Sequence, residues 1–301
     1  FHDAIKKEIV PIRDILVENR KKELGYDNYK PWDTEVDVKG LTPLKPFEGG
    51  TELINLSAEC FNRLRPYFGE CLSTMKAMQH LDLESKEGKS PGGFMCPLDE
   101  IGVPFIFMNA VGSQRDVTTM VHEGGHAIHS FLSRDLSLTE FKSTPSEVAE
   151  LASMSMELLS MDHWDVFYTN DDDLKRAKLE QLEDVLYKLP LIIEVDKFQH
   201  WVYTNNHTAQ QRKEKWNELQ STFNNPIVDW RGYEEVRANS WQDILHLYIV
   251  PFYVIEYGMA QLGAIAMWRS YRQLGEKALE NYMNALKLGY TKTIGEIYET
   301  A

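Results

Sequence analysis

The sequence predicts a mainly α-helical protein with a small β-sheet beside one motif-bearing helix. Apolar residues recur at helical spacing over most of the 301 residues. Two short stretches, 94–96 and 104–109, are typical of strands and follow the turn-forming run 87–93. The next predicted helix, 116–133, contains the pattern H-E-x-x-H at residues 122–126.

The bulk composition sets limits on size and partners. A hydrophobic content of 43% is enough for a sizeable core. The length allows one large domain or two modest ones, and we expect residues 1–301 to form one catalytic domain. The formal net charge of -14 argues against a nucleic-acid or anionic-membrane partner. No apolar run reaches the ~18 residues of a membrane span, and no signal peptide is recognisable.

The cysteines indicate the compartment. Cys60, Cys71 and Cys96 are scattered and form no C-x-x-C pair, which argues against a disulfide framework or a structural zinc site. A reducing, cytoplasmic setting is therefore expected.

Helical periodicity covers most of the chain from residue 1 to residue 288. Residues 25–50 are expected to be irregular, since prolines and glycines punctuate them. The acidic run 171–173 is interpreted as a solvated helix start. The predicted helices span residues 1–24, 51–79, 116–133, 145–161, 173–203, 208–223, 231–239, 240–270 and 274–288.

The H-E-x-x-H helix is the centre of the functional prediction. His122 and His126 are four residues apart, so they share a helix face and can bind one zinc ion. Glu123 lies to the side, where it can reach water activated by the ion. Asp116 is the expected N-cap. The simpler alternative is a pair of buried, hydrogen-bonded histidines on a core helix.

A catalytic zinc needs a third protein ligand and an open position. The extended motif with a third histidine is excluded, because His129 occupies its glycine position and Leu132 its last histidine position. His129 shares the face of His122, but it lies nearly a full turn beyond the second ligand. We therefore expect His129 to pack beside the site or to support it.

Glutamates of the predicted helix 145–161 are better candidates. Thr144, Pro145 and Glu147 suggest a capping box, which makes Glu147 a capping residue. Glu150 heads an apolar run and should be buried, which favours a metal partner. Glu157, two turns later on the same face, is the alternative ligand or a residue that orients one.

These motifs resemble a known family. Residues 122–129 (HEGGHAIH) and 150–157 (ELASMSME) are similar to the zinc-binding core of the oligoendopeptidase F and thimet oligopeptidase family. Residues 88–94 (GKSPGGF), 108–117 and 241–261 resemble its oligoendopeptidase F branch, so the similarity spans residues 75–290. The family's usual N-terminal helical part has no counterpart here, so the chain is expected to be the C-terminal catalytic part.

The resemblance implies a zincin-like helical metallopeptidase domain with one zinc ion per chain and Glu150 as third ligand. It implies that short, unstructured peptides enter a deep channel. It also implies that His246, Tyr253 and Tyr257 line that channel and contact the substrate or the oxyanion. Without the resemblance, these rings are more simply an aromatic core stripe.

The expected activity is zinc-dependent cleavage of internal bonds in short oligopeptides. Glu123 would act as general base and pass the proton to the leaving amine. Phe105, Met108 and Asn109, from the predicted strand, are expected to contact the substrate beside the motif helix, unless the strands only support that helix. The alternatives are a zinc carboxypeptidase or dipeptidase on a similar scaffold, and a truncated peptide-binding fragment without catalysis.

Overall fold

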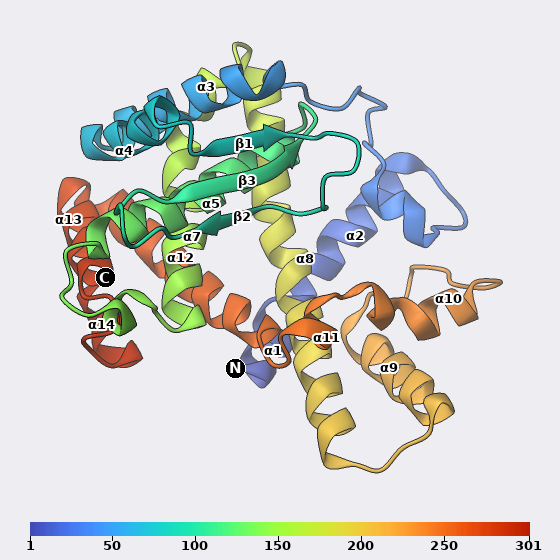
Figure 1. The fold of residues 1–301 in the computed structure, drawn as a ribbon. Coiled ribbons are helices and arrows are strands. Elements are labelled where there is room, and N and C mark those ends of the chain that lie inside the picture. The colour runs from blue at the N-terminus through green and yellow to red at the C-terminus, as the bar shows by residue number, and fades with distance from the viewer. The chain divides into compact units, whose positions relative to one another are not determined.

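The computed structural model describes all residues from Phe1 to Ala301. The chain forms two compact units, one of Phe1–Thr42 with Glu180–Gly258 and one of Pro43–Leu179 with Met259–Ala301. Both consist mainly of helices, and the second also holds the only sheet, which confirms the predicted fold class (Figure 1). Helices α8 (Asp171–Thr204) and α12 (Val254–Leu274) each continue from one unit into the other.

The first unit consists mainly of helices, with one isolated β-bridge between Tyr29 and Val228. The predicted helix 1–24 is two helices separated at Ile9, because Pro11 occupies the first turn of the second, where no backbone N–H is needed. The predicted helix 240–270 is also interrupted, and Phe252 there has a φ of 65°, in the left-handed region. Besides parts of α8 and α12, the elements are α1 (His2–Glu8), α2 (Val10–Leu24), η1 (Pro31–Glu35), α9 (Ala209–Phe223), α10 (Glu234–Asn239), η3 (Ser240–Asp243) and α11 (His246–Ile249).

The second unit holds the sheet and the motif helix. The predicted helix 51–79 is broken at Arg65, whose extended conformation is the one favoured before a proline. The short helices α6 and α14 were not predicted. The elements are α3 (Gly49–Leu64), α4 (Pro66–Ala77), β1 (Leu81–Glu84), β2 (Phe94–Cys96), β3 (Phe105–Ala110), α5 (Gln114–Ser133), α6 (Thr139–Lys142), α7 (Ser146–Ser160), η2 (Met161–Val166), α13 (Glu276–Lys287) and α14 (Ile294–Thr300).

The sheet has the strand order β1-β3-β2 (Figure 1). The central strand β3 pairs in parallel with β1 and antiparallel with β2, with Phe107 opposite both Asp82 and Phe94. Alternate residues of β3 are buried, so one face of the sheet packs on the core. Strand β2 lies at one edge and contacts α5.

Helix α5 begins two residues before the expected start. Its N-cap is Ser113, whose hydroxyl accepts a hydrogen bond from the Asp116 backbone, while the Asp116 carboxylate accepts from the Ser113 backbone. The prediction that Asp116 is the N-cap was therefore wrong, since Asp116 is the reciprocal third residue of a capping box.

Helix α7 lies almost wholly in the core of its unit, from Glu150 through Ser160. It begins at Ser146 with Pro145 as the N-cap and no side-chain cap. The predicted capping box of Thr144 and Glu147 was therefore wrong, because the helix starts one residue too late for it.

None of the helices combines the length and the apolar character needed to cross a membrane.

Candidate metal centre

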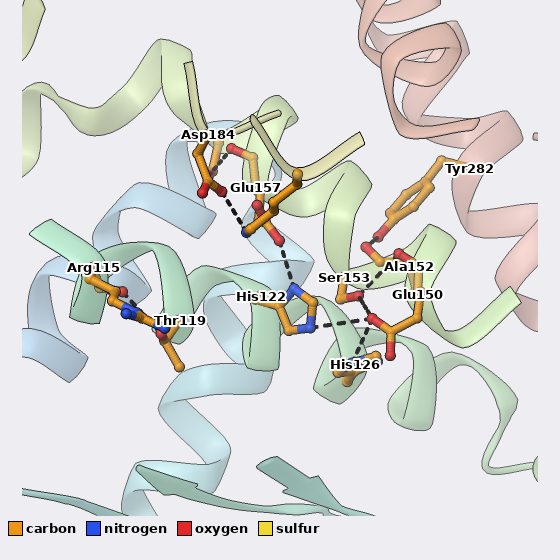
Figure 2. A network of polar contacts seen from close by, with 12 residues as sticks. Arg115, Thr119, His122, His126, Glu150, Ala152, Ser153, Glu157, Asp184 and Tyr282 are labelled. Carbon is orange, nitrogen blue, oxygen red and sulfur yellow. Dashed lines mark hydrogen bonds and ion pairs between the residues drawn. The ribbon is translucent and has the colours of Figure 1, made fainter. Parts of the chain in front are cut away.

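Helices α5 and α7 bring His122, His126 and Glu150 together (Figure 2). One ligand atom from each lies within 4.8 Å of the other two. The Oε2 atom of Glu150 is 3.4 Å from Nε2 of His122 and 3.7 Å from Nε2 of His126. The two imidazole rings stand nearly perpendicular, at 86°. Both Nε2 atoms and one carboxylate oxygen thus face the same point.

Two glycines allow the helices to pack this closely. A Cβ on Gly125 would lie 2.6 Å from the Cα atom of Ser153 and 2.8 Å from the carbonyl oxygen of Ala152, both in α7. A Cβ on Gly124 would lie 2.7 Å from the Phe61 ring of α3. The two glycines in mid-helix are explained by packing against the helices on either side.

The cluster is buried on one side and accessible on the other. The side chain of Glu150 is 4% exposed, whereas those of His122 and His126 are 19% and 15% exposed. A carboxylate so deeply buried needs a positive partner. The partial exposure of the imidazoles leaves an approach for a small ligand.

Glu157 contacts the other side of His122. Its Oε1 atom lies 2.6 Å from Nδ1 of His122, so the two ring nitrogens of this histidine face two different carboxylates. A hydrogen bond to Nδ1 fixes the tautomer and leaves Nε2 directed at the cluster.

Burial and these carboxylates separate the pKa values of the two histidines. Burial lowers the pKa of His122, but its hydrogen bonds to Glu150 and Glu157 outweigh that effect and raise the pKa to about 10. Burial lowers the pKa of His126 to about 4, because no carboxylate bonds to it as closely. In the metal-free cluster, His122 is therefore the more readily protonated of the two imidazoles.

Glu123 is also buried, one residue after the first histidine. Burial is the main cause that raises its pKa to about 7, and the charge of Glu150 acts in the same direction. A backbone hydrogen bond from Met95, in the edge strand β2, opposes the shift. A carboxyl group with a pKa near neutrality can both take up and release a proton at physiological pH.

The donor set fits a zinc ion. Two imidazole nitrogens and one carboxylate oxygen, with a fourth position open, form the ligand set typical of catalytic zinc sites. The buried negative charge of Glu150 and Glu157 also favours a divalent cation over a lone protonated imidazole.

His129 lies on α5 but outside the cluster. It hydrogen-bonds to the backbone of Leu286 in α13, and burial lowers its pKa to about 3, so the ring is neutral. Its ring thus packs beside α13 and does not face the cluster.

The three residues expected to contact the substrate all lie in β3. This strand is central and paired on both sides, so it offers no free edge to a peptide. Met108 is buried in the core, and the Asn109 amide donates to the carbonyl oxygens of Ser90 and Gly92. Phe105 is only partly exposed. The free edge nearest to Glu123 belongs to β2 instead.

The other predicted site residues lie in the first unit. The rings of His246, Tyr253 and Tyr257 form one cluster, with centroids between 5.2 and 6.0 Å apart. The Tyr257 hydroxyl lies 3.4 Å from Nε2 of His246. The three side chains are partly exposed, which distinguishes them from a buried core stripe.

One polar contact at the cluster was not predicted. The hydroxyl of Ser153 lies 3.0 Å from Oε2 of Glu150 (Figure 2). The spacing of three residues on one helix was visible in the sequence, but serines at this spacing usually bond to the backbone instead.

The model of peptidase family M3 matches residues 1–301, the entire chain. The chain belongs to peptidase family M3. It is 25% identical over 295 residues to an oligoendopeptidase F homolog of Borreliella burgdorferi, and 24% identical over 304 residues to oligopeptidase PepF of Bacillus subtilis. These alignments cover 95% of this chain in both cases, and 48% and 40% of the relatives.

Several solved structures resemble the whole chain. PZ peptidase A with inhibitor 2 matches with a TM-score of 0.92 and 29% identity, over 99% of this chain and 53% of that one. The oligoendopeptidase F of Enterococcus faecium matches with a TM-score of 0.62 and 18% identity, over 100% of this chain and 46% of that one. At this low identity, the match supports the fold alone. The chain therefore spans about half the length of the relatives it matches.

Proposed function

We propose that this chain carries the catalytic zinc site of an M3 oligopeptidase that cleaves internal bonds of short, unstructured peptides. The observation that carries the proposal is the convergence of His122, His126 and Glu150 beside Glu123, in a chain matched throughout by a peptidase family. The zinc ligands are the Nε2 atoms of the two histidines and the carboxylate of Glu150, with one ion per chain.

The chemistry follows from these positions. When bound, the ion supplies Lewis-acid activation of water and of the scissile carbonyl group. Glu123 accepts the proton from the attacking water and transfers it to the leaving amine. The group must be a base first and an acid afterwards; burial raises its pKa, and a bound divalent cation would lower it. Glu157 holds His122 in one tautomer throughout.

The peptide is proposed to lie along strand β2. This strand is at the edge of the sheet, and its residue Met95 already bonds to Glu123. An extended peptide can add to such an edge by main-chain hydrogen bonds, which bind any sequence in an unfolded conformation. The aromatic cluster of His246, Tyr253 and Tyr257 is proposed to supply hydrogen-bond donors to substrate or oxyanion.

The deciding experiment replaces Glu123 with glutamine. We expect Glu123→Gln to retain zinc and to lose cleavage of an internally quenched peptide that is blocked at both ends. Glu70→Gln, at an exposed position on α4, is the control and should keep both properties. Full activity of Glu123→Gln would exclude the proposed base.

The same measurements separate the alternatives. Cleavage of free peptides but not of blocked ones would indicate a carboxypeptidase or dipeptidase. A zinc-loaded wild-type chain that binds peptides without cleaving them would indicate a binding fragment.

The proposal also includes a reducing, cytoplasmic setting, which rests on three unpaired thiols, two of them buried.

A further inference from the structure

The hydroxyl of Ser153 contacts the carboxylate oxygen that faces both histidines. It lies 3.0 Å from Oε2 of Glu150, and the same Oε2 is the atom nearest to His122 and His126. The hydroxyl also lies 3.0 Å from the backbone oxygen of Glu150. A hydroxyl has one proton, and the charged carboxylate is the stronger of these two acceptors.

We propose that Ser153 is a positioning residue that holds the Glu150 carboxylate in the orientation needed to bind the metal. The inference rests on the proposed function, because Glu150 is assigned there as the third zinc ligand. A glutamate side chain has several free torsions. The entropy that it loses when it becomes ordered on metal binding weakens the affinity for the metal. A hydrogen bond that fixes Oε2 before the metal binds reduces this entropy loss.

The surroundings keep Ser153 itself in place. The carbonyl oxygen of the preceding residue, Ala152, accepts a hydrogen bond of 2.7 Å from the buried hydroxyl of Tyr282 in α13. On the other side, the Cα atom of Ser153 packs against Gly125 of the motif helix. This stretch of α7 is therefore held between α13 and α5, and the Ser153 hydroxyl acts from a fixed backbone.

Burial makes this contact hard to replace. Ser153 is 0% exposed, so water has no direct access to the position of its hydroxyl. Removal of the hydroxyl would leave Oε2 without this donor and would free the carboxylate to turn away from the histidines.

The same helix provides a matched control. Ser155 is also 0% exposed, and its hydroxyl has no hydrogen-bond partner among the protein atoms. Ser153→Ala and Ser155→Ala remove the same atom from equally buried positions two residues apart. Only the first removes a contact with Glu150.

The test measures zinc affinity of the metal-free chain by competition with a chromophoric chelator. Ser153→Ala is expected to raise the zinc dissociation constant about 10- to 100-fold, the range typical of residues that support metal ligands. Ser155→Ala should keep the wild-type value. The absorption spectrum of the cobalt-substituted protein should change in Ser153→Ala and not in Ser155→Ala, because it reports the ligand geometry.

Thermal unfolding separates positioning from a general loss of stability. The rise in melting temperature on adding zinc should be smaller in Ser153→Ala than in the wild type, whatever happens to the metal-free melting temperature. Equal zinc affinity of wild type and Ser153→Ala would overturn this inference but leave the proposed function intact. A wild-type chain that binds no zinc would overturn the proposed function, and this inference with it.

Discussion

The Oε1 atom of Glu157 lies 2.6 Å from Nδ1 of His122, while Nε2 of the same ring faces Glu150 at 3.4 Å. One imidazole is thus held between two carboxylates that come from a single helix, two turns apart. The arrangement requires Nδ1 to carry the proton when Nε2 binds a metal, which fixes both the tautomer and the plane of the ring.

Replacement of Glu157 by glutamine should therefore weaken zinc binding. The amide oxygen can still accept from Nδ1, but it lacks the negative charge, so we expect a zinc dissociation constant about tenfold higher. Glu147→Gln, on the same helix and outside the metal cluster, is the control and should bind zinc like the wild type. Unchanged zinc affinity in Glu157→Gln would show that its charge does not support His122.

Gly125→Ala tests the packing that brings the two helices together. The added methyl group would lie 2.6 Å from the backbone of Ser153, so α5 and α7 must move apart. We expect a loss of about 1–3 kcal/mol in the free energy of unfolding, as for overpacked cores, and weaker zinc binding. Urea unfolding and zinc titration measure the two effects.

Gly295→Ala is the matched control for that prediction. A Cβ at Gly295, in α14, meets no atom within 4 Å, so the alanine variant should be as stable as the wild type or more stable. If Gly125→Ala unfolds at the same urea concentration as Gly295→Ala, the close approach of the helices does not constrain residue 125.

The motif residues could be predicted because their geometry is local. His122 and His126 share a face through the helical repeat alone, and Glu150 could be inferred from the apolar run that follows it. The structure places these three side chains together. No such local rule exists for Ser153, because a serine at its position can bond to either of two acceptors and only the packed side chain decides.

The elements that were missed depend on distant contacts or on unusual backbone. Strand β1 is four residues long and pairs with β3 more than twenty residues later, so its own sequence indicates no strand. The predicted helix 240–270 is interrupted where Phe252 adopts a left-handed conformation, which aromatic residues seldom do. Sequence periodicity continues across that interruption, and Pro251 is the local sign that the helix could be kinked or begin there.

Lys89 links the loop after β1 to the sheet. Its ammonium group donates to the carbonyl oxygens of Asp82 and Glu84, at 3.0 and 2.8 Å, and lies 4.3 Å from the centre of the Phe107 ring. Lys89→Met keeps most of the side chain but removes these contacts. We expect a loss of about 1–3 kcal/mol in the free energy of unfolding, measured in urea.

Lys86→Met is the control for Lys89→Met. Lys86 also pairs with Asp82, but its side chain is 63% exposed, against 7% for Lys89. An exposed ion pair contributes little to stability, so the free energy of unfolding of Lys86→Met should stay within about 0.5 kcal/mol of the wild-type value. If the two variants lose the same amount of stability, the burial of Lys89 does not strengthen its contacts with the sheet.

Glu194 in α8 should make the stability of the chain depend on pH. The residue is 1% exposed, and neither carboxylate oxygen has a hydrogen-bond partner among the protein atoms. Burial raises its pKa to about 8, although Arg13 and Arg237 act in the opposite direction. The folded state therefore holds this proton at a pH where the unfolded chain, with a pKa of 4.5, has released it.

The sign of the effect follows from that difference. The pKa of Glu194 is higher in the folded state than in the unfolded chain. Its contribution to the free energy of unfolding is therefore fully present below pH 4.5 and is lost as pH rises through about 8. Glu194→Gln keeps the neutral shape at every pH. At pH 5 it should match the wild type within about 1 kcal/mol, and at pH 9 it should be more stable by about 4–5 kcal/mol in urea unfolding. Glu23→Gln, at an exposed position of α2, should follow the wild type at both pH values. A constant difference between Glu194→Gln and the wild type from pH 5 to pH 9 would mean that Glu194 does not titrate in this range.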